Sequence, residues 1–132
     1  MFKKTILLTA ALLCAGWALC RGEDWTDAQI VNAIYWAEGG PKADYLYGIR
    51  SVEYDNAAEA RRICFNTVRN NRRRFTAQTE YNDFINFLAS RYCPVGAGND
   101  PEGVNINWIK NVRYYLDNPK PIAEKGGDCQ CL

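Results

Sequence analysis

The sequence predicts a mainly α-helical fold, with about four helices packed around one core. Hydrophobic residues recur at helical spacing in four segments, which indicates four amphipathic helices. Capping residues precede most of these segments, and glycine or proline follows several of them. When residues 1–20 are set aside, 112 residues remain, a length that suits one domain with a single core.

Residues 1–20 have the three zones of an export signal. Lys3 and Lys4 give a positive start, Thr5 to Leu19 is an uncharged apolar run, and small residues stand at the cleavage position. The run is shorter than the roughly 20 residues that a membrane-spanning helix needs. We therefore expect cleavage, a periplasmic or secreted location and a mature protein that does not span the membrane. The alternative is an uncleaved segment that anchors the chain.

The first helix is expected to run from about Asp27 to Glu38. Thr26 and Gln29 have the spacing of a capping box, in which each residue satisfies a backbone N–H group of the other. Ile30, Ala33, Ile34 and Ala37 lie on one face of this helix. Two glycines and a proline follow directly and are expected to end it.

Residues 45–54 are rich in aromatic and β-branched types that alternate loosely, so we expect a short strand, a hairpin or an extended arm. A second helix is expected to begin near Asn56, and a third to span 81–92. A long loop rich in glycine and proline then leads to a fourth helix, for which Asn105 is the candidate cap. The domain predicted in this way covers residues 21–118.

Four of the six cysteines belong to the exported part of the chain, and an oxidising compartment favours disulfides. We expect Cys64 to pair with Cys93. Cys129 and Cys131 lie in the segment 119–132, which we expect to be a poorly ordered tail. Two thiols are too few for a zinc site, so this pair is interpreted as a terminal staple or as unpaired.

The sequence contains no histidine. This excludes hydrolases with a Ser-His-Asp or Cys-His centre, HExxH metalloproteases and His-ligated zinc sites. Any proton transfer must therefore fall to carboxylate, tyrosine, lysine or cysteine side chains. We expect neither a metal nor a cofactor.

Six arginines lie within fourteen residues of the second helix, although the net charge of the exported part is near −1. We expect a solvated helix face with salt bridges to Glu59 and Asp83. Attraction to anionic cell-wall polymers is one alternative, and a grip on nucleic-acid phosphates is another. An exported protein of this charge is not expected to bind nucleic acid. The arginines are Arg61, Arg62, Arg69, Arg72, Arg73 and Arg74.

Glu38 is the candidate residue for acid–base chemistry, because it continues the core-facing stripe of Ile30 and Ile34. The negative end of the helix dipole opposes its ionisation, and partial burial acts in the same direction. Both effects are expected to raise the pKa of Glu38, which is what a general acid needs at neutral pH. The alternative is an ordinary glutamate that faces solvent beside two glycines.

The order of motifs around Glu38 resembles the lysozyme-like superfamily of peptidoglycan-cleaving enzymes. There the catalytic glutamate closes a helix, and an aromatic-Gly-Ile/Leu segment follows, as Tyr47-Gly48-Ile49 does here. The likeness is closest to the bacterial glucosaminidase branch, whose segment reads Asn-Leu-Phe-Gly-Ile-Lys. Lytic transglycosylases are the second most similar group. Two features depart from that pattern: Gly39 stands where a serine usually follows, and the gap between Glu38 and Tyr47 is shorter.

The later part of the chain is similar to the same branch. There a tyrosine closes one helix, as Tyr92 would here, and Asn105-x-x-Trp108-x-x-x-Val112 matches the start of the next. The resemblance implies an α+β lysozyme-like fold with Glu38 as general acid/base. It also implies that Tyr47, Gly48 and Ile49 shape the floor of the cleft, that the Tyr92 hydroxyl orients the N-acetyl group or steadies charge, and that Trp108 stacks on a sugar unless it belongs to the core.

A second carboxylate is a separate question. Glu53 is the first candidate for it, and Asp44 and Asp55 are others. Such a group would hold a water for inversion or act as a nucleophile for retention. Many single-glutamate members of the superfamily need none, because the substrate's N-acetyl group assists and an anhydro product forms.

Together these features predict an exported, monomeric glycosidase or lytic transglycosylase that cleaves peptidoglycan glycan strands. A non-enzymatic cell-wall-binding or structural protein on the same scaffold is the first alternative. A phage-type lysis protein with a retained signal anchor is the second, and a nucleic-acid binder is the last. The sequence leaves open which glycosidic bond is cleaved, and whether the enzyme is a hydrolase that leaves a reducing end or a transglycosylase that leaves an anhydro end.

Overall fold

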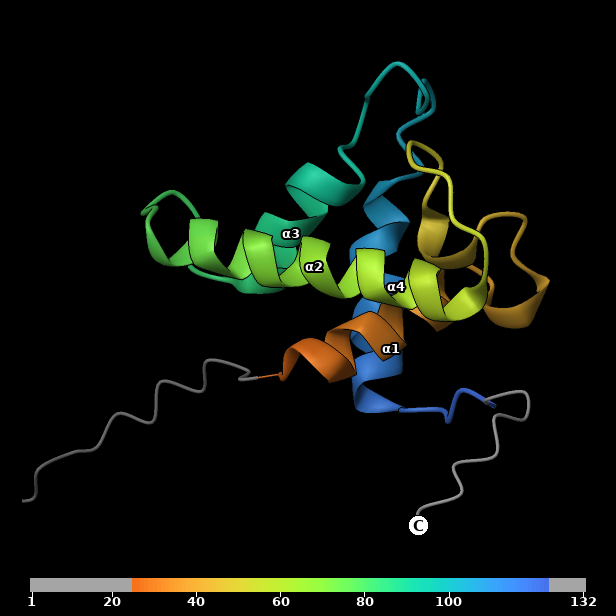
Figure 1. The fold of residues 1–132 in the computed structure, drawn as a ribbon. Helices are drawn as coiled ribbons and strands as arrows, with labels where there is room; N and C mark the ends of the chain where they lie inside the picture. The colour runs from red at the N-terminus through yellow and green to blue at the C-terminus, as the bar shows by residue number, and fades with distance from the viewer. Residues whose placement is uncertain (1–24, 124–132) are drawn as a thin grey trace, which may run out of the picture.

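We describe residues 25–123 of the chain from a computed structural model (Figure 1). These residues form a mainly α-helical fold around one core, as the sequence predicted; they contain no β-strand, so the α+β form that the resemblance implied is not found in them. The expected signal segment and the Cys129–Cys131 pair lie outside the described residues. The helices are α1 (Asp27–Ala37), α2 (Ala57–Thr76), α3 (Phe84–Tyr92) and α4 (Ile106–Asp117), with two 3₁₀ turns, η1 (Gly40–Lys42) and η2 (Leu46–Gly48).

Helix α1 packs against both α2 and α4. Its N-terminus has the predicted capping box: the Gln29 N–H donates to the Thr26 hydroxyl over 3.2 Å, and the Thr26 N–H donates to Gln29 Oε1 over 2.8 Å. Four residues of α1 are buried, which places its hydrophobic surface on more than one side. They are Ile30, Val31, Ala33 and Ile34.

Helix α2 begins after Asn56 as predicted, because the Asn56 side chain accepts the backbone N–H of Glu59 over 2.9 Å. Its buried stripe contains Ala60, Cys64 and Val68. In Figure 1 it lies across the front of the molecule. Helices α3 and α4 complete the core with Phe84, Ile85, Phe87, Leu88, Ala89, Trp108, Val112 and Leu116.

Helix α3 begins three residues later than expected, at Phe84 rather than at 81. Asp83 is its cap, and Asp83 Oδ1 accepts the N–H of Asn86 over 2.8 Å. The segment 45–54 is an irregular arm that contains η2, so the short-strand alternative for it is wrong. No helix within 25–123 is both long enough and apolar enough to cross a membrane.

The first residues after α4 lie on α1, although the segment from 119 onward was expected to be poorly ordered. The carbonyl oxygen of Lys120 accepts hydrogen bonds from Asn32 Nδ2 (2.8 Å) and Trp36 Nε1 (3.1 Å). Its ammonium nitrogen lies over the rings of Trp36 and Tyr115, 5.5 and 5.2 Å from their centres. This contact fixes the chain to the end of α1; residues 124–132 are outside the described part.

The basic residues of α2 form some of the expected ion pairs. Arg62 pairs with Glu59 at 3.0 Å, as predicted, but Asp83 pairs with Arg113 of α4 at 2.8 Å instead of with an arginine of α2. Arg72 reaches Asp27 at the start of α1, with 2.6 Å between Nε and Oδ1. The last pair joins two helices, whereas an exposed pair within one helix contributes little to stability.

The predicted Cys64–Cys93 disulfide is not formed, because both residues are free thiols. Tyr92, the last residue of α3, faces Cys64, with 3.9 Å between the tyrosine oxygen and the sulfur. Successive side chains of a helix differ in direction by about 100°. Cys93 follows Tyr92 directly, so it points to a different side of α3 and cannot occupy the place that Tyr92 takes beside Cys64.

The loop between α3 and α4 is folded around a buried carboxylate. Asp100 is only 1% exposed, and its side chain accepts the backbone N–H groups of Gly96 (3.1 Å) and Asn105 (3.2 Å). The Asn105 side chain was expected to cap α4, but it donates to the Pro94 carbonyl over 2.9 Å instead. Because Asn105 immediately precedes α4, Asp100 fixes where that helix begins.

We expect Asp100→Ala to lower the free energy of unfolding by about 1–3 kcal/mol, since the N–H groups of Gly96 and Asn105 lose the buried carboxylate that accepts them. Chemical denaturation measures the change. Glu102→Ala is the matched control: this carboxylate is exposed in the same loop, so its loss should cost less than about 0.5 kcal/mol. Equal effects of the two substitutions would show that Asp100 does not organise the loop.

Candidate active site

Glu38 lies directly after α1, as its C-terminal cap, and its N–H donates to the Ile34 carbonyl over 3.0 Å. The chain turns sharply there because Gly39 has a φ of 109°, in the left-handed region that favours glycine. After this turn the chain returns through η2, and η2 packs on α1. The Glu38 side chain is therefore partly buried between the end of α1 and the returning chain.

Two groups from distant parts of the chain lie against the Glu38 carboxyl group. Trp108 of α4 donates its indole N–H to Oε1 over 2.8 Å. On the other side lies the backbone of Gly48, so close that a Cβ atom there would be 2.7 Å from the Glu38 carboxyl carbon. Gly48 also has a φ of +67°, so both its conformation and this approach require a glycine.

The pKa of Glu38 is raised, chiefly because burial disfavours the charged form. The hydrogen bond from Trp108 and the positive charge of Arg50 act in the opposite direction and limit the rise. The direction agrees with the expectation from sequence. The carboxyl group is thus held between an environment that favours its acid form and a donor that stabilises its ionised form.

Tyr47 brings Gly48 to Glu38 by adopting a strained backbone. With a φ of 57°, it is the only non-glycine residue of 25–123 with a positive φ, a conformation that costs on the order of 1–3 kcal/mol. The Tyr92 hydroxyl donates to the Tyr47 carbonyl oxygen. The Tyr35 ring packs on the Tyr47 ring, with 5.2 Å between the ring centres. Arg61 of α2 lies near enough to the Tyr47 hydroxyl for its positive charge to act on it. These contacts hold the strained turn in place.

Tyr92 connects the turn to the core. Because its single hydroxyl hydrogen goes to Tyr47, the Cys64 thiol must be the donor in the 3.9 Å contact between Cys64 and Tyr92. Burial raises the pKa of Cys64 to about 12 and raises that of Tyr92 as well, so both groups stay protonated at neutral pH. The Tyr92 ring stacks on Trp108, with 5.3 Å between ring centres.

The structure thus brings together most of the residues that the sequence singled out, but it changes the roles of three. Trp108 is 6% exposed, so it cannot stack on a sugar, and it belongs to the core while bonding to Glu38. Tyr47 is 3% exposed, so its side chain does not line a cleft. The Tyr92 hydroxyl is already occupied by a backbone carbonyl. Of the predicted floor, Gly48 and Ile49 are half-buried and keep exposed surface.

The candidates for a second carboxylate are not bonded to this cluster within the described residues. Glu53, Asp44 and Asp55 are all exposed, and within residues 25–123 none of them makes a hydrogen bond with Glu38 or its partners. The N–H of Asp55 is bound by Glu59 at the start of α2. Nor do any three cysteine, aspartate or glutamate side chains in this part of the chain lie close enough to hold a metal ion.

Two arginines of the site had no assigned role in the sequence. Arg61 was grouped with the solvated arginines of α2, although it precedes Cys64 by three residues and so shares the inner side of that helix. Arg50 belongs to the arm and acts on Glu38 through its charge. The sequence could have pointed to Arg61 through its helical spacing from the buried stripe of α2. It could have pointed to Arg50 through its place two residues after Gly48.

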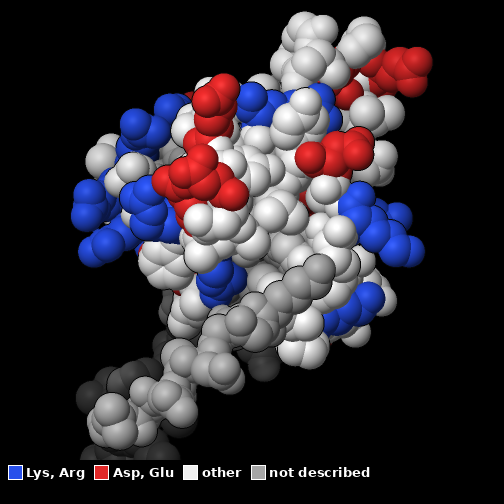
Figure 2. Space-filling view, turned by 45° about the vertical axis from the view of Figure 1, so that its right-hand side comes forward, with Lys and Arg blue, Asp and Glu red and all other residues white. Residues whose placement is uncertain are grey.

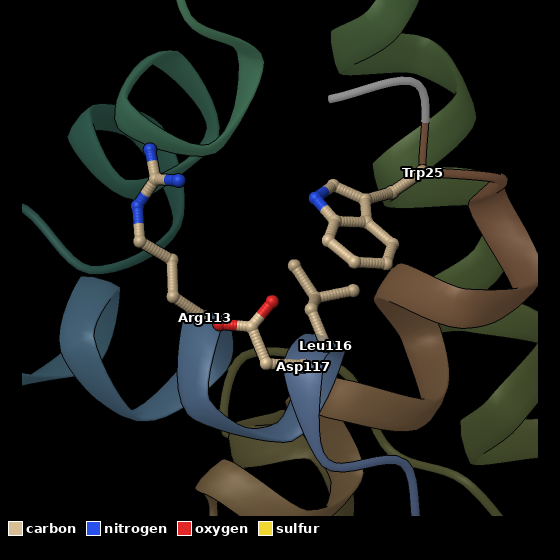
Figure 3. Close-up of a pocket in the computed structure, with 4 residues that line it drawn as sticks. All are labelled: Trp25, Arg113, Leu116 and Asp117. Atoms are coloured by element: carbon tan, nitrogen blue, oxygen red, sulfur yellow. The ribbon is translucent and has the colours of Figure 1, made fainter. Parts of the chain in front are cut away.

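The pocket in Figure 3 lies away from this cluster, between the start of α1 and the end of α4. Trp25, Arg113, Leu116 and Asp117 line it, and the buried indole nitrogen of Trp25 has no hydrogen-bond partner among residues 25–123. None of these residues contacts Glu38.

Neither a protein-family model, nor a curated protein, nor a solved structure matches this chain significantly.

We expect Gly48→Ala to destabilise the protein by about 2 kcal/mol or more, because the new methyl group meets the Glu38 carboxyl group and the backbone is strained. Gly96→Ala is the matched control. Gly96 has a similar φ of +72° but nothing within 4 Å of an added Cβ. Thermal unfolding of both variants separates the contact from the strain. If Gly96→Ala is as costly as Gly48→Ala, the close approach to Glu38 does not matter.

Proposed function

We propose that this protein is a glycosidase or lytic transglycosylase that cleaves the glycan strands of peptidoglycan, with Glu38 as the general acid/base. The observation that carries the proposal is the Glu38 carboxyl group, half-buried between the Trp108 indole and the Gly48 backbone, with a raised pKa. The motif order around it supports the substrate class. The proposal places the mature protein outside the cytoplasm as a monomer, with neither nucleic acid nor a membrane span involved.

The geometry suggests how the proton is held. Trp108 donates to Oε1, so in the acid form the proton resides on Oε2. Oε2 would give this proton to the glycosidic oxygen as the bond to the sugar breaks. The carboxylate left behind keeps the Trp108 hydrogen bond, which stabilises it until it takes a proton back. Glu38 then acts as the base for the group that attacks the sugar.

The attacking group distinguishes the two reaction types. Because Glu53 is exposed on the arm, we propose that Glu38 works without a second acid and that the substrate's N-acetyl group assists. Attack by the sugar's own hydroxyl would then give an anhydro end, and attack by water would give a reducing end. Mass spectrometry of the released fragments tells these products apart.

We expect Glu38→Gln to lower the release of soluble muropeptides from purified sacculi by at least 10²–10⁴-fold, the usual contribution of a general acid. The substitution keeps the size of the side chain and can still accept the Trp108 hydrogen bond, so the fold should persist by circular dichroism. Glu102→Gln, in an exposed loop carboxylate, is the control and should leave the rate unchanged.

An undiminished rate in Glu38→Gln would refute the assignment of the acid. If the wild-type protein binds sacculi but releases nothing, the alternative holds, namely a non-enzymatic cell-wall-binding protein on the same scaffold.

We expect Trp108→Phe to move the basic limb of the pH–rate profile to higher pH. The indole N–H stabilises the carboxylate, so its removal raises the pKa of Glu38 further, and the acid form persists to higher pH. Trp25→Phe is the control, since this substitution removes a buried indole N–H that has no partner in the described part of the chain and does not contact Glu38. A basic limb that stays in place or moves to lower pH would contradict the role of Trp108.

A further inference from the structure

We propose that Arg50 and Tyr45 form an anion-binding subsite beside Glu38, which takes a carboxylate of the muramyl unit. This inference rests on the proposed function and names the part of the substrate that would be recognised. Both residues belong to the arm, and both are exposed; Tyr45 keeps 48% of its surface accessible.

The state of Arg50 supports the subsite. Its guanidinium carbon lies 5.3 Å from the centre of the Tyr45 ring, a cation–π contact that orients the group without neutralising it. Within the described residues, Arg62 and Arg72 have carboxylate partners within 4 Å, whereas Arg50 has none. An oriented guanidinium whose N–H groups have no acid partner is suited to bind a carboxylate through two hydrogen bonds.

The position of Arg50 is fixed relative to Glu38. Gly48, two residues earlier, lies against the Glu38 carboxyl group, and the next turn closes with a 3.2 Å hydrogen bond from the Ile49 N–H to the Leu46 carbonyl. The Leu46 N–H in turn donates to the Tyr54 hydroxyl over 2.9 Å, which ties the two ends of the arm together. Arg50 therefore directly follows the hydrogen-bonded turn whose Gly48 lies against the candidate acid.

The surface around the arm fits a polymer that is uncharged over most of its length and carries carboxylates at intervals. Figure 2 turns the arm side of the molecule forward and shows acidic and basic side chains around an area without charged groups. A glycan strand offers hydroxyl and N-acetyl groups to such an area, and its carboxylates are spaced along the strand. One cation beside the acid would then set which sugar unit lies next to Glu38, because only the muramyl unit carries a carboxylate.

Binding measurements on the full chain test the subsite, with Glu38→Gln present throughout to prevent turnover. The probes are intact glycan strands with peptide stems, strands stripped by an amidase to expose the lactyl carboxylate, and neutral N-acetylglucosamine oligomers. We expect Arg50→Gln to weaken binding of at least one carboxylate-bearing probe about tenfold at low salt, as for a lost charge-assisted pair. Binding of the neutral oligomers should not change.

The pattern among probes identifies the carboxylate. Loss with intact strands only assigns the peptide stem, and loss with stripped strands assigns the lactyl group. Arg50→Lys should recover part of the affinity, because it keeps the charge but not the planar pair of N–H groups. Arg74→Gln is the matched control, an exposed arginine in the last turn of α2.

Three results would overturn the subsite: unchanged affinity in Arg50→Gln, an equal loss with the neutral oligomers, or an equal loss in Arg74→Gln. Because these measurements need no cleavage, they are separate from the test of Glu38. The subsite can fail while Glu38 proves catalytic, and it can hold in a protein that binds without cleaving.

Discussion

The hydrogen bond from Trp108 to Glu38 is the contact on which the rest of the site depends. It joins the end of α1 to the first turn of α4, across 70 positions of the chain. It forms only if α1 and α4 pack closely, if the loop around Asp100 sets the start of α4, and if the Tyr92 ring supports the indole. A hydrogen bond to a charged group contributes about 1.5–3 kcal/mol, so the Trp108 hydrogen bond stabilises this arrangement most when Glu38 is ionised.

The site also stores strain that the surrounding core must offset. Tyr47 holds a left-handed backbone, and Gly48 approaches a carboxyl group that burial has pushed toward its acid form. Tyr92 reaches the same turn directly and Cys64 reaches it through Tyr92, and burial keeps both groups protonated at neutral pH. The thiol is thus better understood as a support for the Tyr92 hydroxyl than as half of a disulfide.

Periodicity and capping residues were sufficient to predict the helices. The capping box at Thr26, the cap at Asn56 and the face that ends in Glu38 are local patterns, and a helix repeats them with a fixed geometry. Trp108 and Gly48 were named from a resemblance, but the resemblance assigned them to the sugar and to the cleft floor and not to direct contact with Glu38. Whether Trp108 faces sugar or core depends on how α4 packs on α1, and the environment of Asp100 depends on a loop without periodicity. Cys93 failed as a disulfide partner because one position along a helix changes the direction of a side chain.

The burial of the aromatic residues has a consequence for how a substrate would be held. Trp108 and Tyr47 support Glu38 from within, so they add to the precision of the acid rather than to the affinity for a sugar. If the proposed function holds, affinity would come from the exposed arm, where Gly48 and Ile49 offer backbone and Arg50 offers charge. Under the proposed function, such a division would suit a polymer substrate: many weak contacts along a strand would hold it in place, and one oriented cation would select the sugar unit that reaches Glu38.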